Sequence, residues 1–397
     1  MLIRKAFKYK LKTTAEIEQK YSMMAGCCRL VWNKALAQNL FRLENKQPLI
    51  WYNEAAFWLK LWKSSEELNF LKQSHSQPLQ QTLKNLERAF KDAFDKNQPL
   101  KRIPKFKKKG QHDSFRYPQG FKINGNRIFL PKIGWVGFFN SKKIIGKPKN
   151  ITVTKESDGW YASIQVEIEH QEQSHPSTSI VGCDLGIKRF ITLSNNTFYE
   201  PLNSFKKYQQ QLAKAQRKLK NKTKFSTNWK KQQKKIGKIH HKIANCRKDR
   251  LHWISNKISK NHAFIVLEDL KVKNMSRSAK GTIDKPGKNV KAKSGLNKSI
   301  LDQGWSMFVD MLKYKQEWRN GEMLLVPPHH TSQTCPSCDH KSKDNRKTQS
   351  HFECVECGFK NNADYVGAIN VLARGHRVLA CGDSRLLGAV KQELKAA

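Results

Sequence analysis

The sequence predicts a multidomain α+β fold, and three observations lead to this expectation. A period-two strand at the N-terminus is followed by about a hundred residues with helical spacing before strands resume. A polar linker over residues 171–179 separates these strands from a second set of apolar strands that end in acidic residues. Two closely spaced pairs of cysteines lie near the C-terminus. A chain of 397 residues has room for two or three domains.

The first strand and the helices after it are predicted by their periodicity. Residues 2–11 alternate apolar and basic side chains, as a half-buried strand does. Thr14 is placed to cap the next helix, and helical spacing continues through residues 51–62 and 78–94. Residues 13–112 are therefore expected to form a helical module inserted after one strand.

Strands resume beyond this module. Asn124-Gly125 and Asp158-Gly159 each predict a hairpin turn between alternating segments. Residues 1–12 and 113–175 are thus expected to form one β-barrel that the helices interrupt, with two separate small domains as the alternative.

The second part of the chain is predicted to contain a basic helical pair. Residues 206–260 carry 19 lysines and arginines but one acid, Asp249, and their apolar residues follow a 3-4-3 spacing. Residues 271–298 are rich in Lys, Gly and Ser, which predicts a mobile basic loop. Residues 381–397 are expected to be a polar tail.

Charge restricts the class of partner. Lysine and arginine number 75 against 32 acids, a net charge of +43, which excludes an ordinary metabolic enzyme with a near-neutral surface. Nucleic acid is the expected partner, with a ribosomal or membrane-surface protein as the alternative. No apolar run approaches the roughly 20 residues of a membrane span, and no signal core follows the N-terminus. We expect a cytoplasmic protein.

Three acids stand at the ends of apolar segments. Asp184 and Glu268 each end an apolar strand, and Asp364 opens an apparent helix. Carboxylates delivered in this way can hold two Mg²⁺ ions for phosphodiester cleavage. Asp269 competes with Glu268, but neighbouring residues of a strand face opposite sides, so only one of them is expected to face the site. Each acid taken alone is more often a surface residue.

The paired cysteines have the spacing of a zinc site. Cys335 and Cys338 are followed 15 residues later by Cys354 and Cys357, and four thiolates form a closed, structural tetrahedral site. Two disulfides are the alternative, which a cytoplasmic chain disfavours. The predicted ribbon directly precedes Asp364 and is placed to set the position of that acid.

Several motifs, taken together in order, resemble the TnpB family of transposon-encoded relatives of type V CRISPR effectors. The motifs are Asp184-Leu185-Gly186-Ile187-Lys188, Leu267-Glu268-Asp269-Leu270, Leu301-Asp302-Gln303-Gly304-Trp305, Thr331-Ser332-Gln333-Thr334-Cys335 and Asn362-Ala363-Asp364. The N-terminal stretches 5–9 and 27–34 also look like that family, so the resemblance covers about residues 1–380. One departure is Val366, where many relatives carry Asn.

The resemblance implies a specific architecture. It consists of a wedge β-barrel with an inserted helical recognition lobe, and a RuvC-type, ribonuclease-H-like nuclease domain with an inserted four-cysteine zinc ribbon. The implied boundaries are 1–12 and 113–175 for the wedge, 13–112 for the lobe, 176–328 and 361–380 for the nuclease, and 329–360 for the ribbon.

The resemblance also implies a function. It predicts an Mg²⁺-dependent, RNA-guided DNA endonuclease in a prokaryotic cytoplasm, associated with the nucleoid when on DNA. Its guide RNA would derive from the transposon end, and its target would be double-stranded DNA beside a short motif that the protein reads. Tyr52, Gln80, Gln81 and Asn85 are candidates for reading that motif, because Gln and Asn can pair with adenine and aromatic rings can contact bases. For each of these residues alone, a solvated helix surface is the commoner explanation.

Two other functions remain open at this point. A transposase would use the same three acids for strand transfer, cutting and joining without a guide. A nucleic-acid-binding regulator would keep the nuclease fold as a scaffold, although the presence of all three acids disfavours it.

Overall fold

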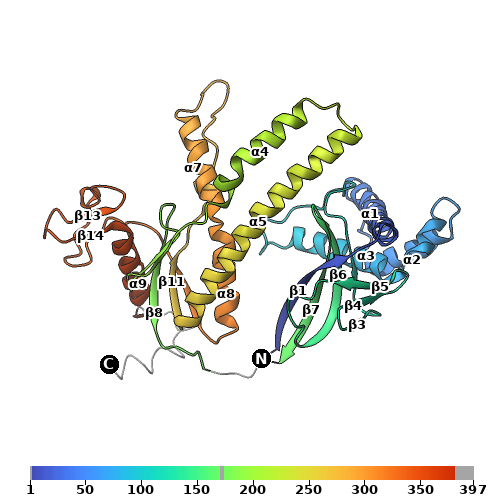
Figure 1. The fold of residues 1–397 in the computed structure, drawn as a ribbon, viewed down its shortest axis with the longest axis horizontal. Helices are drawn as coiled ribbons and strands as arrows, with labels where there is room; N and C mark the ends of the chain where they lie inside the picture. Colours follow the sequence, from blue (N-terminus) through green and yellow to red (C-terminus); the bar gives the residue numbers. More distant parts are fainter. Residues whose placement is uncertain (1, 170–173, 381–397) are drawn as a thin grey trace. The chain divides into compact units, whose positions relative to one another are not determined.

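The computed structural model describes residues 2–169 and 174–380, which divide into two compact units, Met1–Gln171 and Glu172–Ala397 (Figure 1). Among the described residues, no helix is long and apolar enough to cross a membrane. The expected tail, 381–397, lies outside the described part of the chain.

The first unit is built on a seven-stranded antiparallel sheet in the order β2-β6-β7-β1-β5-β4-β3. Its strands are β1 (Leu2–Lys12), β2 (Ser114–Tyr117), β3 (Lys122–Asn124), β4 (Arg127–Leu130), β5 (Gly134–Phe138), β6 (Lys147–Glu156) and β7 (Gly159–Glu169). Strand β1 lies in the middle because its first residues pair with β7 and its last two with β5. The predicted hairpins are present as β3–β4 and β6–β7. A closed barrel requires a pairing between β2 and β3, and the pairings of the described strands do not include one.

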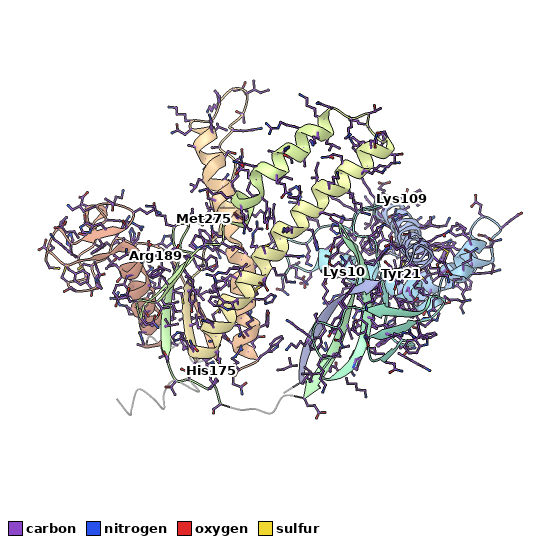
Figure 2. All side chains as sticks on the ribbon, in the orientation of Figure 1. Lys10, Tyr21, Lys109, His175, Arg189 and Met275 are labelled. Atoms are coloured by element: carbon purple, nitrogen blue, oxygen red, sulfur yellow. The ribbon has the colours of Figure 1, made fainter. Side chains whose placement is uncertain are left out.

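The segment that connects β1 to β2 in the sequence is helical, and its helices pack on this sheet. They are α1 (Ala15–Glu44), α2 (Tyr52–Ser64), the short 3₁₀ helix η1 (Asn69–Gln73) and α3 (Ser76–Phe94). Thr14 caps α1 as predicted, since its side chain accepts a hydrogen bond from the amide of Ile17. Tyr21 of α1, labelled in Figure 2, is fully buried and packs against Phe115 and Trp160 of the sheet. The helices and the sheet therefore share one core.

The second unit contains a mixed five-stranded sheet in the order β10-β9-β8-β11-β12. The strands are β8 (Ile180–Leu185), β9 (Ile191–Leu193), β10 (Phe198–Tyr199), β11 (Phe264–Glu268) and β12 (Glu322–Val326). The three strands β8, β11 and β12 run parallel, so their carboxyl ends share one edge of the sheet. Strands β9 and β10 extend the other side as antiparallel neighbours.

Helices cover both faces of this second sheet. Its helices are α4 (Ser204–Lys220), α5 (Thr227–Asn261), α6 (Val272–Met275), α7 (Val290–Gln303), α8 (Trp305–Glu317) and α9 (Ala363–Ala380). Ile265 and Leu267 of β11 face a core shared with α5, α7 and α8. Phe264 and Val266 face the opposite core, which α9 fills with Val371. The strand alternation thus fixes α9 on its own side of the sheet.

Two smaller features complete the second unit. The predicted basic helical pair is the hairpin α4–α5, which extends away from the sheet (Figure 1). A short ribbon with the 3₁₀ helix η2 (Lys343–Asn345) and strands β13 (His351–Glu353) and β14 (Lys360–Asn362) leads directly into α9.

The prediction of a mobile loop over 271–298 was wrong at both ends, where α6 (Val272–Met275) and the first residues of α7 lie. Helix α7 begins at Val290, and Ile300 near its end is buried in the core beneath the sheet. Its first turns are Lys- and Ser-rich and contain Gly295, so their composition resembles a loop. Packing of its last turns rather than helix propensity decides the structure there.

Candidate active site

Two of the predicted acids lie side by side at the carboxyl edge of the second sheet. In the parallel pairing of β8 with β11, Cys183 lies opposite Leu267. The next residue of each strand is an acid, Asp184 on β8 and Glu268 on β11. Apolar side chains before both acids are buried and hold the strands in place.

The third acid reaches this edge from α9. Asn362 caps this helix, because its Oδ1 accepts hydrogen bonds from the amides of Asp364 (3.0 Å) and Tyr365 (3.3 Å). One turn further on, Gly367 faces Asp184 so closely that a Cβ at Gly367 would lie 3.2 Å from Oδ2 of that carboxylate. The first turn of α9 therefore carries Asp364 to the strand that carries Asp184.

Two more glycines allow this close approach. A Cβ at Gly182 of β8 would lie 2.3 Å from the carbonyl oxygen of Ala368 in α9. A Cβ at Gly375 of α9 would lie 2.6 Å from Cγ2 of Val266 in β11. Because no side chain fits at either contact, α9 lies against the sheet backbone and its position is closely fixed.

The electrostatics of the cluster indicate that it requires positive charge. Burial raises the pKa of Asp184 to about 8, and the neighbouring charges of Glu268 and Asp364 add to the shift. Burial likewise raises the pKa of Glu268. Three carboxylates held together without a cation repel one another and favour protonation.

Arginines supply part of that positive charge. Arg346, from the ribbon, lies 3.8 Å from Oδ1 of Asp364 and opposes the rise in pKa at both Asp184 and Glu268. Arg374 of α9 acts on Glu268 in the same direction and donates a hydrogen bond to the carbonyl of Pro327. Sequence reasoning missed both arginines, because nothing in a single basic residue among 75 distinguishes it.

Glu268 is supported by residues that sequence reasoning also left without a role. Its Oε1 accepts a hydrogen bond of 2.6 Å from the hydroxyl of Thr331. Asn370 of α9 in turn donates to the carbonyls of Thr331 and Thr334, both at 2.7 Å. Thr331 belongs to a motif that carried the resemblance, which is the signal that could have found it. By contrast, Asp269 is partly exposed, pairs with Lys271, and lines a hollow that Glu268 also borders.

The four predicted cysteines come together in the ribbon. Their sulfur atoms all lie within 4.8 Å of one another, and two of the separations, Cys335–Cys357 and Cys338–Cys354, are 3.6 Å. A disulfide requires about 2.05 Å, whereas four sulfurs about 2.3 Å from one zinc ion are about 3.8 Å apart. Burial raises the pKa of Cys335 and tends to raise that of Cys354, but backbone hydrogen bonds from Cys357 and Glu356 lower the pKa of Cys354 on balance. The donor set fits Zn²⁺.

Val366 lies between the two sites. It is fully buried in a small core with Cys335, Phe352, Cys354 and Ala363. An apolar residue at this position packs beneath the ribbon, so the chain uses it to join the ribbon to the start of α9.

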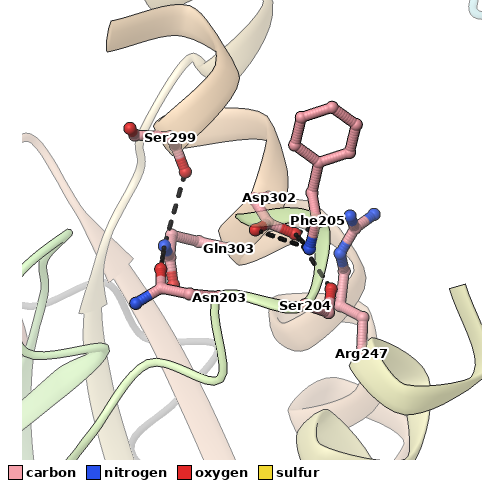
Figure 3. Close-up of polar contacts among 7 residues, drawn as sticks. All are labelled: Asn203, Ser204, Phe205, Arg247, Ser299, Asp302 and Gln303. Carbon is pink, nitrogen blue, oxygen red and sulfur yellow. Dashed lines mark hydrogen bonds and ion pairs between the residues drawn. The ribbon is translucent and has the colours of Figure 1, made fainter. Parts of the chain in front are cut away.

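Another buried acid, Asp302, ties the basic hairpin to the rest of the unit (Figure 3). Its carboxylate accepts hydrogen bonds from the hydroxyl of Ser204 (2.9 Å) and from the amide of Phe205 (2.9 and 3.0 Å) at the start of α4. Arg247 of α5 completes the network with an ion pair of 2.8 Å. Asp302 is thus a cap for α4 and a link to α5, well supplied with partners of its own.

The candidates for base reading lie in the first unit, on α2 and α3, where Tyr52 and Gln81 are partly buried. Gln80 and Asn85 are exposed, and Gln81 donates a hydrogen bond of 2.9 Å to Asn85. Tyr52 lies at the start of α2, with the ammonium group of Lys84 4.7 Å from its ring centre. The four residues therefore lie on two neighbouring helices of the first unit.

Comparison with known proteins places this geometry in a family. Family models described as "Probable transposase", "Cas12f1-like, TNB domain" and "Helix-turn-helix domain" match residues 163–279, 305–371 and 1–47. The chain is 51% identical to "Putative RNA-guided DNA endonuclease InsQ" of Escherichia coli (strain K12), across 98% of this chain and 96% of that protein. It belongs to the TnpB family. A relative from Streptomyces pristinaespiralis, "Putative RNA-guided DNA endonuclease", is 30% identical across 96% of this chain and 92% of its own length.

A solved structure supports the same fold for this TnpB chain. The protein of the "Cas12f1-sgRNA-target DNA complex" superposes with a TM-score of 0.57 at 13% identity, covering 94% of this chain and 99% of that one. The helix-turn-helix description does not fit residues 1–47, where the structure has one strand and one long helix.

Proposed function

We propose that this TnpB chain is an Mg²⁺-dependent, RNA-guided DNA endonuclease. The observation that carries the proposal is the convergence of Asp184, Glu268 and Asp364 from two adjacent strand ends and one helix start. The names of the 51% and 30% identical relatives favour the guided activity over unguided cleavage.

The donor set fits hard divalent cations. Three carboxylates offer only oxygen ligands, and the raised pKa of Asp184 means that the cluster lacks compensating charge. Divalent cations held by these acids supply charge neutralisation and activation of water for phosphodiester hydrolysis. Thr331 orients Glu268 toward the site, and Arg346 places a guanidinium beside Asp364, where it can neutralise a phosphate of the substrate.

The units receive the roles that the family resemblance implies. The seven-stranded sheet, 1–12 and 113–175, corresponds to the wedge, and the helices of 13–112 to the recognition lobe. Residues 176–328 with 361–380 correspond to a RuvC-type nuclease, and 329–360 to its zinc ribbon, in which Cys335, Cys338, Cys354 and Cys357 hold one structural Zn²⁺. Tyr52, Gln80, Gln81 and Asn85 are proposed to read the motif beside the target.

The decisive experiment combines RNA sequencing with a cleavage assay. RNA that copurifies with the protein is sequenced, and the complex is tested with Mg²⁺ on plasmids that carry a matched target beside randomised bases. Matched cutting by the wild type and its loss in D184A support the proposal. Guided binding without cutting favours a regulator, and joining of ends without a guide favours the strand transfer suggested by the "Probable transposase" description.

A further inference from the structure

The tip of the α4–α5 hairpin combines an aromatic pair, an exposed Phe225 and a partly buried Trp229, with a cluster of lysines. Phe225, in the turn between the helices, is 72% exposed, and its ring centre lies 5.5 Å from that of Trp229. A single exposed apolar side chain is common on protein surfaces, so the argument depends on what surrounds the two rings.

The backbone at the tip adds to this argument. Phe225 has a φ of 66°, in the left-handed region that bulky residues rarely adopt. The next residue, Ser226, caps α5 by accepting a hydrogen bond of 3.1 Å from the amide of Trp229. The turn therefore presents the ring of Phe225 outward at some conformational cost.

A basic hollow lies beside the aromatic pair. It has a volume of about 360 Å³, and its lining residues are Lys222, Asn228, Lys231, Gln232, Lys234, Lys235 and Lys238. Eight lysines and no acid occur between residues 220 and 238. Gln232 is buried and donates a hydrogen bond to the carbonyl of Ala215, which holds α4 and α5 together beneath the hollow.

The tip is too far along α5 to take part in the chemistry. Helix α5 joins the core beneath the sheet from Leu251 onward, and Trp229 precedes Leu251 by 22 residues. At 1.5 Å per residue, this distance is about 33 Å. Whatever binds at the tip is held apart from the three carboxylates.

We infer that this tip is a binding site for an unpaired segment of the guide RNA. Phe225 stacks on one base, and the lysines of the hollow contact the phosphates on either side of it. Stacking on an aromatic ring together with phosphate contacts is the chemistry by which proteins hold single strands. The inference rests on the proposed function for the identity of the RNA.

The test measures guide RNA affinity of the full-length protein without DNA. F225A is expected to weaken RNA binding about ten-fold, with F225L nearly as weak and F225Y close to the wild type, because only a ring restores stacking. F225N, which relieves the left-handed strain, should weaken RNA binding while leaving Tm unchanged or slightly raised. RNA with 2-aminopurine at single unpaired positions should report one base whose fluorescence is quenched by the wild type and recovers in F225A.

A matched pair of lysine variants tests the hollow. K231Q/K234Q/K235Q/K238Q should lower RNA affinity and flatten its salt dependence, because fewer counterions are released. The control K280Q/K285Q/K288Q/K291Q removes the same charge from exposed positions of the 271–298 segment and should not change the fluorescence of the quenched base.

Three outcomes would overturn the inference. The first is an RNA affinity of F225A equal to that of the wild type. The second is that the quenched 2-aminopurine fluorescence recovers to the same extent in the hollow variant and in the control variant. The third is that F225A weakens DNA binding but not RNA binding. The last outcome would assign the tip to target DNA. Cleavage by F225A at saturating RNA should stay near the wild-type rate. If the wild type itself fails to cleave, that result counts against the proposed function and not against the RNA site at the tip.

Discussion

The carboxylate of Asp184 lies directly against Gly367, so that a Cβ at position 367 would stand 3.2 Å from Oδ2. This contact joins the first strand of the second unit's sheet to the first turn of its last described helix. The position of the Asp184 carboxylate therefore depends on the absence of a side chain at Gly367. Gly367 lies on α9, the helix that also carries Asp364.

We expect G367A to lower the cleavage rate by about 10–100-fold, because the added methyl group displaces the carboxylate of Asp184 by a few tenths of an ångström. Guide RNA affinity should not change. The matched control is G295A in α7, where a Cβ meets nothing within 4 Å. That variant should cleave normally and gain about 0.5–1 kcal/mol of stability, as alanine does in a helix interior. Equal activity of the two variants would mean that the Gly367 contact is unimportant.

The raised pKa of Asp184 predicts a pH-dependent stability in protein stripped of divalent cations. At low pH the side chain is protonated in both the folded and the unfolded chain and has no effect. Between about pH 4 and the folded pKa of about 8, Asp184 is ionised in the unfolded chain but still protonated in the folded one. The free energy of unfolding therefore falls as pH rises through this range.

The variant D184N removes this loss. At pH 7.5 in EDTA it should unfold about 4–8 °C above the wild type, a difference of about 2 kcal/mol, and the gap should close below pH 4. Added Mg²⁺ should raise the Tm of the wild type more than that of D184N. A constant gap across the whole pH range would show that ionisation of Asp184 is not its cause.

Arg346 is expected to act in cleavage without being needed for zinc binding, although its Nη2 also donates a hydrogen bond of 3.0 Å to the carbonyl of Gln349 within the ribbon. R346A should lower the cleavage rate at neutral pH by about 10–100-fold, because it removes the charge beside Asp364 that can neutralise a substrate phosphate. R346K should recover part of the activity. Both variants should retain one zinc per chain by elemental analysis, and loss of zinc in R346A would point to a structural role instead.

The four cysteines predict a metal-dependent ribbon. C354S should lose stoichiometric zinc and lower the Tm of the second unit, since binding of zinc and folding of such a site are coupled. Cleavage should fall as well, because β14 of the ribbon runs directly into α9 and Asp364. C246S, which alters a cysteine of α5 outside the cluster, is the control. Full zinc content in C354S would contradict the assignment.

Asp302 should be a stability residue. D302N removes the carboxylate that caps α4 and pairs with Arg247, and we expect it to lower the free energy of unfolding by about 2 kcal/mol. D310N, at an exposed position of α8, should differ from the wild type by less than about 0.5 kcal/mol. Urea denaturation of the metal-loaded proteins measures both differences.

Sequence periodicity was sufficient to predict the strands that carry Asp184 and Glu268. Asp184 and Glu268 end runs of apolar residues, and such runs are buried wherever they pair, so the acids had to emerge at the sheet edge. Pairing register then decides that these two acids become neighbours. Register between distant strands is a tertiary property, and only the family motifs pointed to it in advance.

The contacts around the acids were not predictable in the same way. Thr331, Asn370 and Arg346 belong to no periodic pattern, and each acts through one hydrogen bond or one charge that depends on the folded chain. The prediction of a closed barrel depended partly on analogy with the family, and the prediction of a loop over 271–298 depended on composition. The described strand pairings do not include the β2–β3 pairing that closure needs, so the barrel stays a prediction, and core packing of Ile300 gives a helix over the end of the predicted loop.

The place of α9 in the chain has a consequence for synthesis. Residues 204–261, which form the basic hairpin, leave the ribosome about 100 residues before Asp364 does. At about 5–20 residues per second, roughly 5–20 s separate the two events. In a nascent chain, the lysines of the α4–α5 hairpin are therefore synthesised and exposed before Asp364 has been added. The basic hairpin is thus available to RNA before the helix that carries Asp364 can pack against the sheet.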